Sequence, residues 1–142
     1  MWQYETTVSW TSDKEGRLHA GGNPEIIIAT PPEFGGPKNR WTPEDLLAGA
    51  VGSCVMTSSI FFLEKGGVKL LSFLSNATAI MEKTREGLAI TEISVDVRIA
   101  VANEEDIEKA YSAMQKAEAT CPVSKALKCG VSLKTSVTCP AS

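Results

Sequence analysis

Alternating apolar and polar residues predict β-strands in the N-terminal third of the chain. The period of two, which is typical of a half-buried strand, first appears in the apolar or hydroxyl residues Trp2, Tyr4, Thr6, Val8 and Trp10. Turn-forming residues at 13–16 and 21–24 then predict two further short strands, over 17–20 and 25–29. Residues 30–40 hold three prolines and two glycines, so we expect no regular structure there.

The same period predicts three more strands in the rest of the chain. Two long ones cover residues 70–81 and 93–101 and are joined by a turn at 84–87. The second is the clearest strand of all, because polar side chains separate its apolar residues, which are Ile93, Val95, Val97, Ile99 and Val101. A last strand is predicted over residues 131–137.

A long helix is predicted over residues 42–65. Thr42 can cap it, Pro43 suits its first position, and glycines 66 and 67 end it. Its 18 residues from 46 to 63 carry no charge, which is enough apolar length for a membrane span. Small and hydroxyl residues interrupt this stretch, so we interpret it instead as a helix buried on all sides in a soluble protein. Gly49 and Gly52 weaken a helix, which indicates that another group approaches closely there.

A second helix is predicted from Asn103, with acidic residues in its first turn and a stripe of apolar residues formed by Ile107, Ala110, Tyr111, Met114 and Ala117. The segment 120–122 breaks it and starts a short third helix that ends near Gly130. This order of elements predicts a single α+β domain over residues 1–142. One sheet covers only one side of the apolar helix. In a homodimer, the second subunit would cover the rest of its apolar surface.

Composition and charge exclude several function classes. The chain has 142 residues with 17 acidic and 14 basic side chains, and its net charge of -3 argues against binding to nucleic acid or to an anionic membrane surface. A single histidine excludes a His-rich metal site. The N-terminus lacks the features of a secretory signal, so the four cysteines are expected to be reduced thiols in the cytoplasm.

The cysteines are the candidates for chemistry, and each allows two interpretations. Cys54 lies mid-helix on the side shared with Ser58, where it is either a small core residue or a reactive thiol. Cys121 precedes Pro122 at a helix start, where backbone N–H groups either stabilise a thiolate or merely tolerate the residue. Cys129 and Cys139 have no comparable environment. The chain has no C-x-x-C pair, so zinc is not expected.

The segment Trp41 to Cys54, WTPEDLLAGAVGSC, together with Thr120-Cys121-Pro122, resembles the OsmC/Ohr family of osmotically induced and organic-hydroperoxide-resistance proteins. The order of strands and helices extends this resemblance over nearly the whole chain. It implies an OsmC-like α+β fold in which antiparallel sheets wrap around long central helices of an intertwined homodimer.

The resemblance also implies a thiol-dependent peroxidase that reduces organic hydroperoxides to alcohols. Cys54 then attacks the peroxide and becomes a sulfenic acid, and Cys121 resolves it to an intramolecular disulfide. The family's acidic residue, ten positions before the attacking cysteine, matches Glu44. Its catalytic arginine is matched best by Arg17, with Arg40 as the second choice. No bound cofactor is implied, since an external dithiol, for which a lipoyl group is one candidate, reduces the disulfide.

Such a site needs a group that lowers the pKa of the attacking thiol. An ordinary thiol with a pKa of about 8.5 is only about 3% ionised at pH 7. To ionise most of it, the site must stabilise the thiolate by about 2.7 kcal/mol. A helix dipole supplies about 0.3–1 kcal/mol, and burial acts against ionisation. A guanidinium from Arg17 or Arg40, held by Glu44, would have to lie close to Cys54.

Without the resemblance, Glu44 is simply an acid in the first turn of a helix and Arg17 is a solvated hairpin residue. Two rival functions therefore remain. The chain could be a non-enzymatic redox sensor or carrier of a hydrophobic ligand, or an interaction domain with inert thiols. A disulfide that forms with peroxide but is reduced slowly by any dithiol would indicate the sensor. An ordinary alkylation rate at Cys54 would indicate inert thiols.

Overall fold

The computed structural model describes residues 1–140, which form two compact units, one ending at residue 46 and one beginning at residue 47. Each unit is described here by itself. The expectation of one domain over residues 1–142 stays a prediction, and its last two residues lie outside the described part.

The first unit contains a small antiparallel sheet with the strand order β1-β2-β3, formed by β1 (Thr7–Ser12), β2 (Glu15–His19) and β3 (Ile26–Ala29). The prediction that the first strand includes Trp2 and Tyr4 is wrong, because both precede β1 and are 85% and 92% exposed. β1 has a strand partner on one edge only, and all six of its residues are exposed. Alternation alone therefore overestimated both the length and the burial of this strand.

The proline-rich loop that follows β3 is irregular except for one 3-10 turn, η1 (Pro32–Phe34). Proline fits this turn because it occupies the first helical position, where no N–H bond is lost. Gly36 allows the loop to fold back on itself, since a Cβ at this position would overlap the carbonyl oxygen of Thr30. The expectation that the prolines exclude all regular structure was thus wrong for these three residues.

Helix α1 (Pro43–Lys65) begins and ends where the sequence predicts. At its start the Asp45 N–H donates to Thr42 Oγ1 at 3.0 Å, and the Thr42 N–H donates to Asp45 Oδ2 at 3.1 Å, which is a reciprocal cap. At its end Gly67 takes a positive φ of 69°, and the Val68 N–H reaches back to the Leu63 carbonyl at 3.0 Å. Glycine suits this left-handed position, so the helix terminates here.

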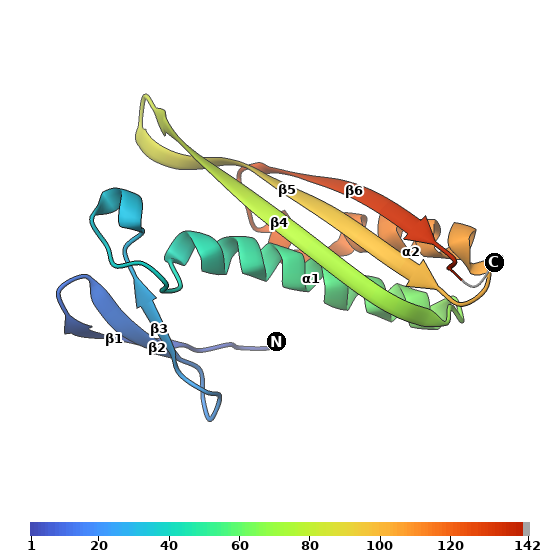
Figure 1. The fold of residues 1–142 in the computed structure, drawn as a ribbon, viewed down its shortest axis with the longest axis horizontal. Coiled ribbons are helices and arrows are strands. Elements are labelled where there is room, and N and C mark those ends of the chain that lie inside the picture. Colours follow the sequence, from blue (N-terminus) through green and yellow to red (C-terminus); the bar gives the residue numbers. More distant parts are fainter. Residues whose placement is uncertain (141–142) are drawn as a thin grey trace. The chain divides into compact units, whose positions relative to one another are not determined.

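The second unit contains a mixed sheet with the order β4-β5-β6, whose strands are β4 (Leu70–Thr84), β5 (Gly87–Val101) and β6 (Gly130–Thr138). β4 and β5 form an antiparallel hairpin, but β6 runs parallel to β5. The expectation of purely antiparallel sheets is therefore wrong. Helices α2 (Asp106–Thr120) and α3 (Pro122–Lys125) connect β5 to β6 and return the chain to the end of the sheet where β5 began (Figure 1).

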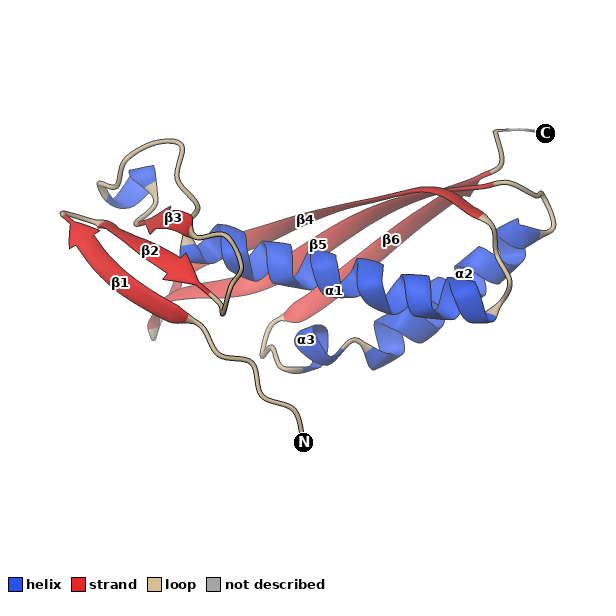
Figure 2. Ribbon diagram, turned by 90° about the horizontal axis from the view of Figure 1, so that it is seen from below, coloured by secondary structure: helices blue, strands red, loops and turns tan. Residues whose placement is uncertain are grey.

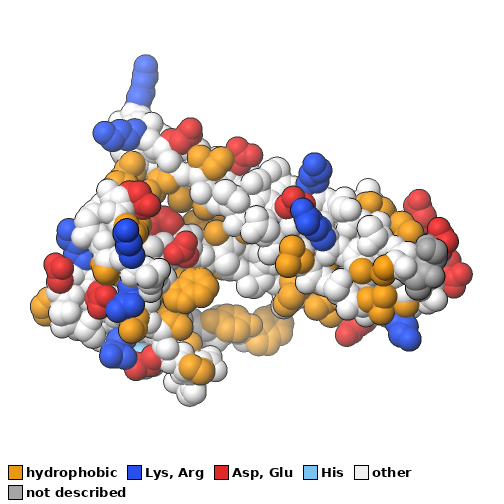
Figure 3. Space-filling view, viewed as in Figure 1, with side chains coloured by type: hydrophobic (Ala, Val, Ile, Leu, Met, Phe, Trp, Pro, Cys, Tyr) orange, Lys and Arg blue, Asp and Glu red, His pale blue; other side chains and the backbone are white. Residues whose placement is uncertain are grey.

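The core of the second unit lies between the sheet and its helices. Figures 1 and 2 show α1 and α2 on one face of the sheet, and the predicted apolar face of β5 is at most 2% exposed along Ile93, Val95, Val97, Ile99 and Val101. From α1 the buried residues are Val51, Gly52, Val55, Ser59 and Leu63. The opposite face of the sheet is exposed and carries polar side chains together with charged ones (Figure 3), such as Asp96, Arg98 and Lys134.

The single chain leaves part of α1 uncovered, so its expected burial on all sides by a second subunit stays a prediction. The helix packs against the β4–β5–β6 sheet and meets Cys121 and the start of α3, but Met56 and Phe61 are 37% and 55% exposed. By length and composition α1 could also cross a membrane, with a mean hydropathy of 1.9 and 28% of its most apolar stretch buried. Core helices of soluble proteins can have the same length and hydropathy.

Asp106 ties the start of α2 to the start of β4. Its carboxylate is 3% exposed, and Oδ2 accepts the Lys69 backbone N–H at 3.3 Å and Asn103 Nδ2 at 3.4 Å. Replacing Asp106 with Ala would leave this N–H without an acceptor, which costs about 1–3 kcal/mol. We expect Asp106→Ala to lower the free energy of unfolding by this amount in chemical denaturation. Glu108→Ala, an exposed change in the same helix, should stay within about 0.5 kcal/mol; equal effects of the two variants would contradict this role.

Candidate active site

Cys54 is positioned by a close contact between α1 and β4. A Cβ at Gly52 would lie 3.3 Å from Ser75 Oγ and 3.4 Å from Ala77 Cβ. The Ser75 hydroxyl also donates to the Gly52 carbonyl at 3.3 Å. The expected close approach is thus confirmed for Gly52. At Gly49 a Cβ would meet nothing within 4 Å in the described chain.

Cys121 lies at the break between α2 and α3 and is completely buried. Its backbone is extended, with φ -62° and ψ 111°, and it is the N-cap residue of α3. Pro122 occupies the first helical position, and the Lys125 N–H donates to the Cys121 carbonyl at 3.1 Å. The predicted helix start at this cysteine is confirmed. The following helix is shorter than expected, since it ends at Lys125.

The structure brings these two cysteines together, although they are far apart in the sequence. Each thiol shifts the pKa of the other, so the two side chains lie close together. Each sulfur also has a serine hydroxyl beside it: Ser58 Oγ lies 3.8 Å from Cys54 Sγ, and Ser124 Oγ donates to Cys121 Sγ at 3.3 Å. The site therefore combines α1, which supplies Cys54 and Ser58, with α3 and its N-cap, which supply Cys121 and Ser124.

The two thiols differ in acidity. Burial raises the pKa of Cys54, and the hydrogen bond with Cys121 raises it further, while bonds from the Val123 N–H and the Ser58 hydroxyl act the other way without reversing the shift. Burial also acts to raise the pKa of Cys121. It is outweighed by hydrogen bonds from Cys54, from the Ser124 hydroxyl and from backbone N–H groups of α3, so the pKa of Cys121 is lowered. In the described chain Cys121 is therefore the more acidic thiol of the pair.

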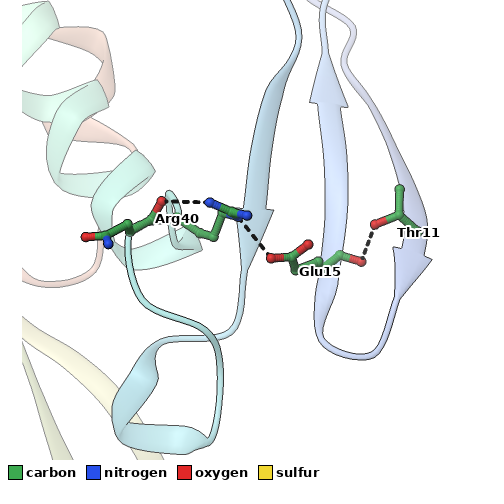
Figure 4. Close-up of polar contacts among 4 residues, drawn as sticks. Thr11, Glu15 and Arg40 are labelled. Carbon is green, nitrogen blue, oxygen red and sulfur yellow. Dashed lines mark hydrogen bonds and ion pairs between the residues drawn. The ribbon is translucent and has the colours of Figure 1, made fainter.

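The predicted arginine and glutamate positions are all in the first unit. Arg17 forms an exposed ion pair with Glu25 at 3.7 Å. Arg40 Nε donates to Glu15 Oε1 at 2.9 Å (Figure 4). Glu44 Oε1 is buried and has no hydrogen-bond partner among the described residues. The first unit therefore does not contain the expected pair between Glu44 and either guanidinium, and the catalytic roles of these three residues stay predictions.

The remaining cysteines do not join this pair. Cys129 and Cys139 are half-buried against the core, and Cys139 Sγ donates to the Ala102 carbonyl at 3.6 Å. Within residues 1–140, no three His, Cys, Asp or Glu side chains are grouped to hold a metal ion. Ser124 is the site residue that sequence reasoning missed. Its position three residues after Cys121, on the same helical turn, could have indicated it.

Residues 35–136 match the family of OsmC-like proteins. The chain belongs to this family. It is 24% identical over 116 residues to the uncharacterized protein YmaD of Bacillus subtilis, a match covering 80% of this chain and 77% of YmaD. It is 32% identical over 91 residues to peroxiredoxin OsmC of Escherichia coli, which covers 64% of this chain and 63% of that protein.

Solved structures show the same fold. An OsmC-like protein of unknown function from Vibrio cholerae superposes with a TM-score of 0.88 at 15% identity, covering 96% of this chain and 100% of the other. An organic hydroperoxide resistance protein from Elizabethkingia anophelis gives 0.76 at 20% identity, covering 98% and 97%. The expected OsmC-like α+β fold is therefore confirmed, with two three-stranded sheets.

The interaction between the two thiols predicts how the pKa of Cys121 responds when Cys54 is replaced. Because Cys54 helps to lower the pKa of Cys121, Cys54→Ala should raise that pKa. Titration of the ultraviolet thiolate absorbance of the reduced protein should show one thiol per chain ionising below the ordinary range, and this early step should move to higher pH in Cys54→Ala. Cys129→Ala serves as the control and should leave the early step unchanged. An early step that persists unshifted in Cys54→Ala would contradict the described pair.

Proposed function

We propose that this chain is a cysteine-based peroxidase that reduces organic hydroperoxides to alcohols. The single observation that carries the proposal is that Cys54 on α1 and Cys121 at the start of α3 lie close enough for each thiol to shift the pKa of the other. Two such thiols can be oxidised to a disulfide with only small movements. Relatives described as a peroxiredoxin and as an organic hydroperoxide resistance protein support this choice of oxidant.

The proposed reaction has three steps. The Cys54 sulfur attacks the terminal peroxide oxygen, the O–O bond breaks, and the alcohol leaves with the proton that Cys54 gives up, so that Cys54 becomes a sulfenic acid. The Cys121 thiolate then attacks the Cys54 sulfur and displaces hydroxide, which forms the disulfide. An external dithiol, of which a lipoyl group is one candidate, finally reduces this disulfide and restores both thiols.

The first step needs a group that ionises Cys54, because burial and its neighbour raise its pKa. We propose that a guanidinium does this, with Arg17 as the first candidate and Arg40 as the second, and that Glu44 holds it. The buried, unpartnered Oε1 of Glu44 supports this role, since a buried carboxylate oxygen normally accepts a hydrogen bond. The surface ion pairs of both arginines are exposed, and such pairs are weak enough to exchange.

We further propose an intertwined homodimer in which the uncovered side of α1 packs against a second copy. Met56 and Phe61 on this side are exposed in the single chain. Gly49 faces open space, although a glycine in the middle of a helix weakens it by about 1 kcal/mol relative to Ala. A close approach by a partner backbone would explain both the apolar residues and the glycine.

A second candidate function is a redox sensor that forms the same disulfide without efficient turnover. The raised pKa of Cys54 favours it, since a protonated thiol reacts slowly with peroxide. The two candidates share the disulfide and differ in how fast a dithiol restores the reduced pair.

The enzyme proposal predicts distinct behaviour for the two cysteine variants. With cumene hydroperoxide as oxidant and dihydrolipoamide as reductant, the wild type should turn over continuously. Cys54→Ser should lose peroxide consumption, because the attacking sulfur is gone. Cys121→Ser should consume one peroxide per chain, form a sulfenic acid and then stall. Peroxide consumption by ferrous-ion oxidation and trapping with dimedone would measure these outcomes.

Cys129→Ser provides the matched control and should remain active, since Cys129 does not contact the pair. Unchanged turnover in Cys54→Ser would show that the assignment is wrong. Formation of the wild-type disulfide without multiple turnovers, for every dithiol tried, would favour the sensor.

The dimer proposal predicts that a charge on the exposed side of α1 separates the two copies. Phe61→Glu would bury an unpaired carboxylate in the interface, which costs several kcal/mol, so analytical ultracentrifugation should show a monomer. Leu88→Glu introduces the same change at a site that is equally exposed, at 54%, and should leave the dimer intact. A wild-type monomer at micromolar concentration would contradict the proposal.

A further inference from the structure

We propose that Ser124 is a further catalytic residue: its hydroxyl donates a hydrogen bond to Cys121 Sγ and stabilises the thiolate that displaces hydroxide from oxidised Cys54. The inference rests on the proposed function, because it concerns the second step of that reaction. It adds a third side chain to the cysteine pair and explains which of the two sulfurs is held in the ionised form.

The local fold fixes Ser124 beside the sulfur. Cys121 caps α3, and Ser124 follows it by three residues, which in a helical turn places both side chains on the same side. Ser124 Oγ lies 3.3 Å from Cys121 Sγ and donates to it. Pro122 at the first helical position and the Lys125 N–H bond to the Cys121 carbonyl hold this turn. The hydroxyl is therefore aimed at the sulfur by backbone geometry as well as by its own hydrogen bond.

Burial makes this hydroxyl important. Cys121 is completely buried, so water cannot solvate its charge and protein donors must do so instead. The donors around the sulfur are the Cys54 thiol on α1, the Ser124 hydroxyl, and the N–H groups of Val123 and Ser124. Cys54 is the one titratable group among them. No charged side chain is among these donors, so the loss of one hydroxyl should raise the pKa of Cys121 measurably.

The second serine of the site has a different position. Ser58 Oγ lies 3.8 Å from Cys54 Sγ, and either atom could be the donor. Its contact is with the less acidic thiol, whereas Ser124 contacts the more acidic one. A hydrogen bond to a charged acceptor is about twice as strong as one between neutral groups, so Ser124 has the larger effect on ionisation.

The step that Ser124 serves is balanced as follows. The Cys121 thiolate donates an electron pair to the Cys54 sulfur and forms the S–S bond, while the S–O bond of the sulfenic acid breaks and hydroxide leaves. Cys54 is reduced from sulfenic acid to disulfide, and Cys121 is oxidised from thiolate to disulfide. When the bond forms, the sulfur loses its charge and the Ser124 hydroxyl loses its charged acceptor.

This role predicts how the rate of disulfide closure in a variant without the hydroxyl depends on pH. Loss of the hydroxyl raises the pKa of Cys121 by about one unit, which lowers its thiolate fraction about tenfold at low pH. A more basic thiolate is a better nucleophile by about threefold per pKa unit. Disulfide closure should therefore be about threefold slower below the wild-type pKa and about threefold faster well above it. A merely structural defect would slow closure at every pH.

The decisive experiment compares Ser124→Thr with Ser124→Val in the full-length protein. These side chains have the same shape, but only Thr retains the hydroxyl. The first measurement, thiolate absorbance of the reduced protein against pH, needs no peroxide. We expect the early thiol ionisation to stay in place in Ser124→Thr and to move up by about one pH unit in Ser124→Val. Ser112→Ala, an exposed serine of α2, should match the wild type.

The second measurement follows disulfide closure after a single cumene hydroperoxide pulse, by acid quenching and mass spectrometry at several pH values. The expected result is a crossing of the Ser124→Val and wild-type profiles. Equal thiol ionisation in Ser124→Thr and Ser124→Val, or parallel closure profiles, would overturn the role of Ser124. A wild type that forms no sulfenic acid would instead reject the proposed function, while the absorbance titration would still decide the role of the hydroxyl.

Discussion

The close contact of α1 with β4 at Gly52 is the constraint on which the rest of the site depends. The missing side chain lets the helix approach within van der Waals distance of Ser75 and Ala77, and the Ser75 hydroxyl bonds the helix backbone at that point. Cys54 follows two residues later, so the depth of α1 on the sheet sets the position of its sulfur. Two sulfurs must approach to about 2 Å to form a bond, which leaves little tolerance for a larger residue.

The chemistry of the pair follows from the difference in acidity between its two thiols. Cys121 is buried and Cys54 is half-buried, and the donors that lower a pKa are gathered around Cys121. Cys121 is thus the thiol that ionises more readily in the described chain.

The sequence was most informative where a local signal was sufficient. The cap at Thr42 and glycines 66 and 67 gave both ends of α1, because helix termini are decided by a few neighbouring residues. The strict alternation of β5 gave its buried face, because that strand is central in its sheet. These predictions needed no knowledge of the rest of the fold.

Local signals failed where a distant partner decides the outcome. Trp2 and Tyr4 alternate with polar residues but have no neighbouring strand. The direction of β6 depends on where α2 and α3 deliver the chain. Tyr111 fits the apolar stripe of α2, yet it is exposed and its hydroxyl accepts the Val137 N–H of β6 at 3.2 Å. The meeting of Cys54 and Cys121 likewise came from the family resemblance and not from any pattern along the chain.

The parallel pairing of β6 has a consequence for the energetics of oxidation. It requires a crossover, and Cys121 lies inside that crossover, so a bond to Cys54 would enclose a ring of about 70 residues containing the β4–β5 hairpin and α2. In the chain-entropy treatment a covalent ring of this size disfavours the denatured ensemble by about 4 kcal/mol. By thermodynamic reciprocity the native fold favours the closed ring by the same amount, so the oxidised protein would resist denaturation better and would require a strongly reducing dithiol to reopen it.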